Sequence, residues 1–175
     1  MHSIATRTGD EGMTGLLYGQ RVPKHHPQIE ALGAFDELNV ALGAVKPLLP
    51  DETVRPLLVG LQRDLVALMG ELACDEADTA RYAASKFAKI TAAEIAKLDA
   101  AVADLEARGL KFDGWATPGA TALGAAFDTA RVIARRAERR LSALPQAGRS
   151  VRPELRQFTN RLADLLWLLA RQAEQ

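Results

Sequence analysis

Apolar residues recur every three or four positions in five separate segments, and this pattern constrains the fold more than any other feature of the sequence. Such spacing places apolar side chains on one face of an α-helix. We predict helices over residues 28–46, 51–72 (or from 53), 91–109, 120–144 and 153–172, with a polar surface connection at 75–90. Helices of about twenty residues are ~30 Å long. Five of them with mostly short links favour an all-α, antiparallel five-helix bundle of the up-down type.

Single residues mark the ends of these predicted helices. Thr91 and Glu94 have the spacing of a capping box, which begins a helix. Gly109 is expected to end that helix, because glycine adopts the left-handed conformation found after helix ends. Pro145 is expected to close the fourth helix, and Pro153 suits the first turn of the fifth.

Composition limits the class of protein and its partners. The 175 residues form one ordinary domain, 1–175, and the 22 basic residues balance the 22 acidic ones. A net charge of zero argues against bulk attraction to nucleic acid or to an anionic membrane. No uninterrupted apolar run reaches the ~18 residues of a membrane span. The single cysteine, Cys74, fits a reducing cytoplasm and is expected to be a small buried apolar residue.

The fourth predicted helix has two different faces. Its apolar seam consists of Phe127, Ala130, Ala134, Ala137, Leu141 and Leu144. Its polar stripe consists of Asp128, Arg131, Arg135, Glu138 and Arg139. Arginines at i and i+4 repel one another mildly, and that cost falls when an anion lies across from them. The stripe therefore indicates either a site for a polyanion such as phosphate or a solvated face balanced by its own acidic residues.

The fifth predicted helix repeats this design. Its apolar face consists of Leu155, Phe158, Leu162, Leu165, Leu166 and Leu169. Asn160, Asp164, Trp167 and Arg171 follow at intervals of four, three and four on the other side. A purely solvated face rarely has Asn and Trp in register, so this stripe favours a ligand site or a subunit interface over solvent.

Residues 1–23 are rich in glycine and threonine and are expected to form a loop that is ordered at least in part. Glycines let backbone N–H groups converge on an anion, and threonines add hydroxyl donors. Asp10 or Glu11 is placed to approach a nucleotide-bound magnesium ion, and Lys24 to contact phosphate. The spacing is not that of a Walker loop, and a flexible terminus would have a similar composition. No metal-binding spacing or nucleophile–base pattern stands out.

Together, these segments resemble the PduO-type ATP:cob(I)alamin adenosyltransferases. The resemblance rests on 6–14 (TRTGDEGMT) with Gly19, Arg21 and Lys24, on 30–39 (EALGAFDELN), on 130–139 (ARVIARRAER), and on 160–166 (NRLADLL) with 169–171 (LAR). These motifs span nearly the whole chain. Each is modest alone, but four in this order are specific.

The resemblance implies a trimer of five-helix bundles with active sites between subunits, which transfers the adenosyl group of ATP to the cobalt of reduced cobalamin. The resemblance implies that magnesium is carried by ATP, and that the ATP-binding residues of one subunit are Thr6, Arg7, Thr8, Gly9, Asp10, Gly12, Thr14 and Lys24. The adjacent subunit is implied to complete the site with Arg135, Glu138 and Asn160. Asp36 and Arg131 are implied to form an intersubunit salt bridge. Trp115, Asp164 and Trp167 are implied on the cobalamin side. Arg135, Lys24, Asp164 and Trp115 are the implied catalytic residues, and a flavoprotein reductase and a B12-dependent enzyme are the implied protein partners.

The chain departs from the family pattern near the expected corrin side. Trp115 stands where phenylalanine is usual, Ala120 where a second glycine is usual, and Asp128 where histidine is usual. Ala163 and Trp167 replace a common serine and a common phenylalanine. These departures leave open a divergent member that binds ATP or a corrinoid as a sensor or carrier without turnover. A helical scaffold that uses its polar stripes only for subunit contacts is a third reading.

Overall fold

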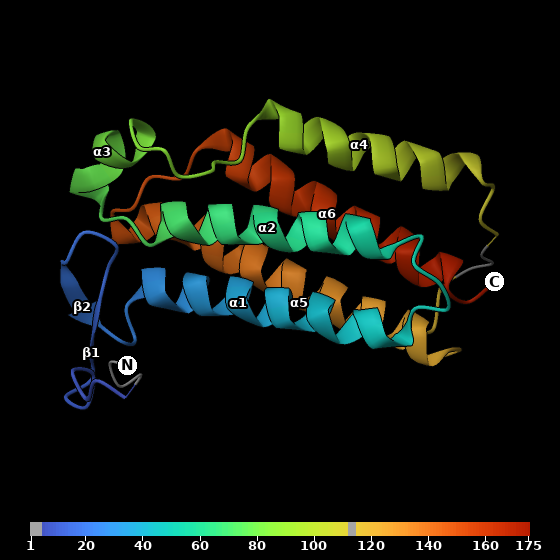
Figure 1. Ribbon diagram of the computed structural model, residues 1–175, viewed down its shortest axis with the longest axis horizontal. Coiled ribbons are helices and arrows are strands. Elements are labelled where there is room, and N and C mark those ends of the chain that lie inside the picture. The colour runs from blue at the N-terminus through green and yellow to red at the C-terminus, as the bar shows by residue number, and fades with distance from the viewer. Residues whose placement is uncertain (1–4, 112–114) are drawn as a thin grey trace.

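Five long helices lie side by side in the computed structural model, which describes residues 5–111 and 115–175 (Figure 1). They are α1 (Pro27–Val45), α2 (Arg55–Leu72), α4 (Ala92–Ala107), α5 (Ala122–Ala143) and α6 (Pro153–Gln172). The mostly helical character and the position of each long helix agree with the sequence prediction. The first four residues of the predicted N-terminal loop, and residues 112–114 of the connection before the fourth predicted helix, lie outside the described residues.

Two predicted irregular segments contain regular structure. Within the predicted loop, strands β1 (Met13–Gly15) and β2 (Arg21–Pro23) pair antiparallel. Within the predicted connection 75–90 lie a 3-10 turn (Glu76–Asp78) and a short helix, α3 (Thr79–Ala83). The described chain therefore has six α-helices and a small sheet, which corrects the purely helical five-helix prediction. Strands of three residues are too short to show an alternating pattern of apolar residues. A helix of five residues is likewise too short to show apolar residues at helical spacing.

Local capping explains where the long helices begin and end. α5 begins after Thr121, whose side chain accepts a hydrogen bond from the third residue of its first turn, so the helix starts later than 120. Thr91 and Glu94 form the predicted capping box of α4. Gly109 follows the end of α4 with φ +69°, the left-handed conformation expected of it. α2 begins at Arg55 rather than at 51 or 53.

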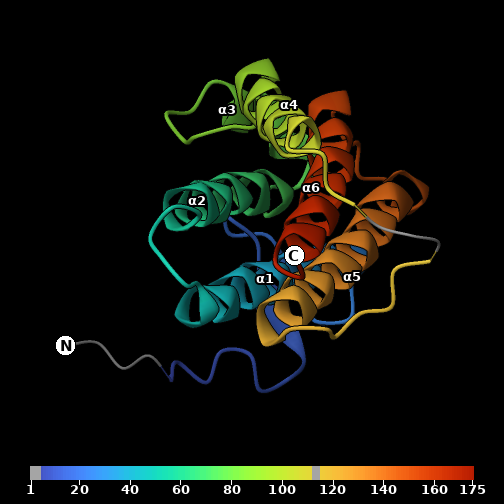
Figure 2. The same cartoon turned by 90° about the vertical axis from the view of Figure 1, so that its right-hand side faces the viewer.

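The helices pack in the order α2, α1, α5, α6, α4, each against the next (Figure 2). The predicted apolar faces supply the core: the seam of α5 and the apolar face of α6 are buried along their whole predicted length. Ala130, Ala134 and Ala137 are fully buried, so small side chains let α5 approach both α1 and α6 closely. No helix in the described ranges is both long and apolar enough to cross a membrane.

Cys74 lies in the core, as predicted, with no exposed surface. Burial raises the pKa of its thiol above the ordinary value, so the nucleophilic thiolate is scarce at pH 8. We expect a thiol reagent such as DTNB to react with the native protein no faster than the chain unfolds, and at once in denaturant. Rapid reaction of the native protein would show that this end of α2 opens locally.

Candidate active site

The arginines of α5 divide into two groups by their partners. Three have a carboxylate partner within the chain: Arg131 with Asp128, Arg136 with Glu37 of α1 and Arg140 with Glu30 of α1. Arg135 and Arg139 have none among the residues that the structure describes. Both are exposed, and Arg139 donates to the backbone carbonyl of Arg135 at 3.1 Å. Asp128 thus balances Arg131 within the predicted stripe, whereas Arg135 is exposed and available to an external anion.

The N-terminal loop folds back on the small sheet and brings Lys24 against it. The backbone N–H of Lys24 donates to the carbonyl of Gly12 at 2.8 Å. A Cβ atom added to Gly9 would lie 3.0 Å from Lys24 Nζ, so the ammonium group packs closely against the backbone at Gly9. The Thr6 and Thr8 hydroxyl oxygens lie 2.9 Å apart. The loop thus gathers hydroxyl groups and one cation, as a phosphate-binding loop would.

A bond from Arg21 and two backbone angles shape this loop further. Arg21 donates to the carbonyls of Thr8 (2.7 Å) and Met13 (3.3 Å), which ties the loop to β2. Gly12 has φ +78° and Arg7 has φ +59°, and both values reverse the chain direction locally. Asp10 is exposed and Thr14 lies within β1.

The remaining predicted site residues lie on the surface of the helices. Asp36 on α1 and Asn160 and Asp164 on α6 are exposed, and Glu138 on α5 is partly exposed. Trp115, ahead of α5, has 92% of its surface exposed. Within the described part of one chain, no hydrogen bond or ion pair joins the loop and Lys24 to Arg135, Glu138 or Asn160. Among the described residues, the two predicted halves of the ATP site are therefore not bonded to one another.

Two predicted members of the polar stripes are buried instead. Asp128 of α5 has 4% of its surface exposed and Arg171 of α6 has 3%, and they form an ion pair across the α5–α6 contact. The Arg171 guanidinium also lies 5.8 Å from the centre of the partly buried Trp167 ring. In the four-residue stripe predicted on α6, Asn160 and Asp164 are exposed, Trp167 is partly buried against the core and Arg171 is buried.

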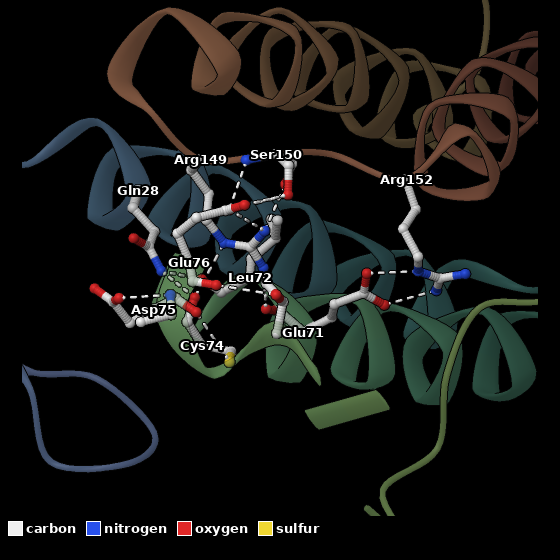
Figure 3. Close-up of polar contacts among 11 residues, drawn as sticks. Gln28, Glu71, Leu72, Cys74, Asp75, Glu76, Arg149, Ser150 and Arg152 are labelled. Atoms are coloured by element: carbon white, nitrogen blue, oxygen red, sulfur yellow. Dashed lines mark hydrogen bonds and ion pairs between the residues drawn. The ribbon is translucent and has the colours of Figure 1, made fainter. Parts of the chain in front are cut away.

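A buried polar network, which the sequence analysis missed, fixes the start of α6 (Figure 3). Arg149, 5% exposed, donates to the backbone carbonyls of Glu71 (2.9 Å) and Cys74 (3.0 Å) at the end of α2. Gln28 of α1 donates to the same Cys74 carbonyl at 2.8 Å. Carbonyls at and just after the end of α2 thus receive side-chain donors from two other segments.

Two carboxylates complete this network. Arg152, directly before α6, makes a bidentate ion pair with Glu71, with both N–O distances 2.7 Å. Glu76 accepts from Ser150 and Arg149. Burial acts to raise the pKa of Glu76, but these hydrogen bonds and the charge of Arg149 hold it below the ordinary value. The network sets the axial position of α6, and with it the positions of Asn160 and Asp164.

The described residues contain no group of three or more His, Cys, Asp or Glu side chains that could hold a metal ion. What the surface offers instead is a threonine- and glycine-rich loop with Lys24, an arginine free of carboxylates, and an exposed indole. This set suits binding of a polyphosphate and a large apolar ring.

Known proteins are similar to this chain in both sequence and fold. The sequence profile of the family described as cobalamin adenosyltransferase matches residues 4–173. The corrinoid adenosyltransferase PduO of Salmonella typhimurium is 41% identical over 169 residues, which cover 97% of this chain and 49% of that protein. A cobalamin adenosyltransferase of Cupriavidus metallidurans is 38% identical, over 98% of this chain and 88% of that protein. The chain thus spans about half the length of the PduO relative but most of the second.

A solved structure agrees with these sequence matches. It is a variant of the PduO-type ATP:corrinoid adenosyltransferase from Lactobacillus reuteri, complexed with cobalamin and ATP. It superposes with a TM-score of 0.87 at 29% identity, over 98% of this chain and 91% of that one. The helical fold with its small sheet is therefore one that carries corrinoid chemistry in other proteins. This chain belongs to the cobalamin adenosyltransferase family.

Proposed function

We propose that this protein transfers the 5′-deoxyadenosyl group of ATP to the cobalt of cob(I)alamin, giving adenosylcobalamin and triphosphate. The observation that carries the proposal is Arg135, an exposed arginine without a carboxylate partner in the described chain, within the family motif of α5. Two neighbouring arginines, Arg136 and Arg140, are paired with α1. The free cation suits a triphosphate, whose oxygens match the paired donors of a guanidinium.

The active site is assembled between subunits of a homotrimer, each of which is a single helical bundle domain. One subunit supplies the loop within 1–23, with Thr6, Arg7, Thr8, Gly9, Asp10, Gly12, Thr14 and Lys24. The adjacent subunit supplies Arg135, Glu138 and Asn160, and its Arg131 pairs with Asp36 across the interface. Within the described residues of one chain these two groups make no bond with one another, which supports this arrangement. Magnesium arrives bound to the phosphates of ATP.

The reaction needs no side-chain nucleophile, because cobalt(I) of the substrate supplies the electron pair. A cobalt–carbon bond forms at the ribose 5′-carbon, the 5′-carbon–oxygen bond breaks, and triphosphate leaves with that bond's electrons. The protein aligns the substrates and stabilises the charge that develops on the leaving group. Arg135 and Lys24 provide that stabilisation. Trp115, Asp164 and Trp167 lie on the corrin side, where the exposed indole of Trp115 is free to pack against the ligand.

A direct assay tests the activity. The protein is mixed anaerobically with ATP, magnesium and chemically reduced cobalamin, and the absorption spectrum is followed before and after illumination. We expect a light-sensitive alkylcobalamin and one triphosphate per product. Binding of ATP and cobalamin without product would instead favour the sensor or carrier reading.

In the cell, we propose that a flavoprotein reductase supplies cob(I)alamin in the cytoplasm and that a B12-dependent enzyme receives the product. The single unpaired cysteine supports the reducing compartment.

A further inference from the structure

Asp128 lies at the centre of a buried charge cluster between α5 and α6. Its carboxylate accepts one bond from Arg131 Nε at 2.8 Å and another from the terminal amino group of Arg171. Arg171 in turn pairs with Glu174 at 3.1 Å. A buried ion needs both charge compensation and hydrogen bonds. Asp128 therefore has two fixed cationic partners and no freedom to turn toward solvent.

The bond to Asp128 determines which part of Arg131 remains available. Nε points inward, and the two terminal amino groups of Arg131 have no hydrogen-bond partner among the described residues. The Arg131 side chain keeps 23% of its surface exposed and borders a shallow hollow of about 280 Å³. Pro118 and Gly119, just after Trp115, line the same hollow. The free edge of this guanidinium thus faces the surface next to the proposed corrin side.

We propose that Asp128 is a positioning residue. Anchored by Arg171, it holds Arg131 Nε inside the bundle and so directs the two terminal amino groups of Arg131 toward Asp36 of a second copy of the chain. Asp36 suits this role because it is exposed on α1, the helix beside α5, and makes no ion pair within the described chain. A carboxylate matches the two parallel donors of a guanidinium edge. The inference rests on the proposed function, which places that contact at the active site.

The test replaces Asp128 with asparagine, which has the same shape but no charge. An asparagine can accept from one arginine, but its amide N–H groups then oppose the donors of the other. We expect self-association, measured by sedimentation equilibrium, to weaken about tenfold, and KM for cob(I)alamin to rise about tenfold, since misplacing an orienting group is costly. KM for ATP is expected to change less than about twofold. Asp104→Asn, which removes an exposed carboxylate paired with Arg108 on α4, is the matched control and should change neither quantity.

A double-mutant cycle separates positioning from a general loss of stability. If Asp128 acts through Arg131, then Asp128→Asn has no further effect on association or on KM once Arg131 is alanine. Additive effects of the two substitutions, or equal rises in both KM values, would overturn the proposal.

A second variant covers the case in which Asp128→Asn does not fold. Arg131→Lys changes a partly exposed residue and keeps its charge, but an ammonium group lacks the planar guanidinium donors that contact two carboxylates at once. The same tenfold losses are expected, and unchanged association would refute the inference. Sedimentation needs no turnover, so the role of Asp128 in assembly can be tested even in a protein that forms no alkylcobalamin. A native protein that assembles normally but forms no alkylcobalamin would refute the proposed function alone.

Discussion

Replacing Arg135 with alanine is expected to lower kcat/KM for ATP by about 100- to 1,000-fold, the usual cost of removing one preorganised donor to a developing anion. Arg135 is exposed and has no carboxylate partner within the described chain. Its charge is therefore not used in holding the subunit together. Helical content and melting temperature should accordingly stay at the native values. Steady-state transfer assays with varied ATP, together with circular dichroism melts, measure both.

Arg140→Ala supplies the control for this experiment. It removes the same charge from the same helix, but Arg140 is paired with Glu30 of α1 at 3.8 Å and lies one turn or more beyond Arg135. An exposed pair of this kind contributes little to stability. We expect a change of less than about threefold in kcat/KM, within the reach of a screened surface charge. Equal losses in both variants would show that α5 contributes only general positive charge, and the assignment of Arg135 would be wrong.

The long helices were predictable because each is specified locally. Phe127, Ala130 and Ala134 lie three and four residues apart, so their shared face is visible without knowing what packs against it. The strands β1 and β2 are held by pairing with one another and by the bond from Leu17 N–H to the Ala73 carbonyl, 2.8 Å long. The Leu17–Ala73 contact joins segments far apart in the chain, and three-residue strands are too short to show an alternating pattern, so neither leaves a local signal.

In the candidate site, too, the sequence predicted features that depend on local spacing and missed those that depend on packing between helices. The sequence placed Arg135 on a polar stripe, but it did not indicate that Arg136 and Arg140, which lie outside that stripe, pair with carboxylates of α1. Asp128 and Arg171 are separated by 43 residues and become a buried pair only when α5 packs on α6. A charged residue amid apolar neighbours, such as Arg171 after Leu168, Leu169 and Ala170, was the available signal. It indicates burial, but it does not name the partner.

Replacing Arg149 with methionine is expected to reduce the free energy of unfolding by about 3–5 kcal/mol, as for other buried charges removed from their partners. Methionine keeps much of the apolar stem, but the carbonyls of Glu71 and Cys74 lose their hydrogen bonds from the buried guanidinium group (Figure 3). A hydrogen bond from a charged group contributes about 1.5–3 kcal/mol, and two such bonds are lost. For a chain of this length, such a loss corresponds to a fall of roughly 10 °C in melting temperature. Urea titration with an unchanged m-value would identify the change as one of native stability.

Arg108→Met is the control that distinguishes a buried arginine from any arginine. Arg108 pairs with Asp104 one turn away on α4, and both side chains are largely exposed. A change of about 0.5 kcal/mol or less is expected there. A similarly small effect at Arg149 would mean that water replaces its bonds and that the network does not hold α6. If Arg149→Met is strongly destabilising, its transfer activity can still be measured well below its melting temperature, and this measurement tests the position of α6. Because Arg149 and Arg152 fix where α6 begins, a folded Arg149→Met enzyme should also lose activity through the displacement of Asn160, which α6 carries.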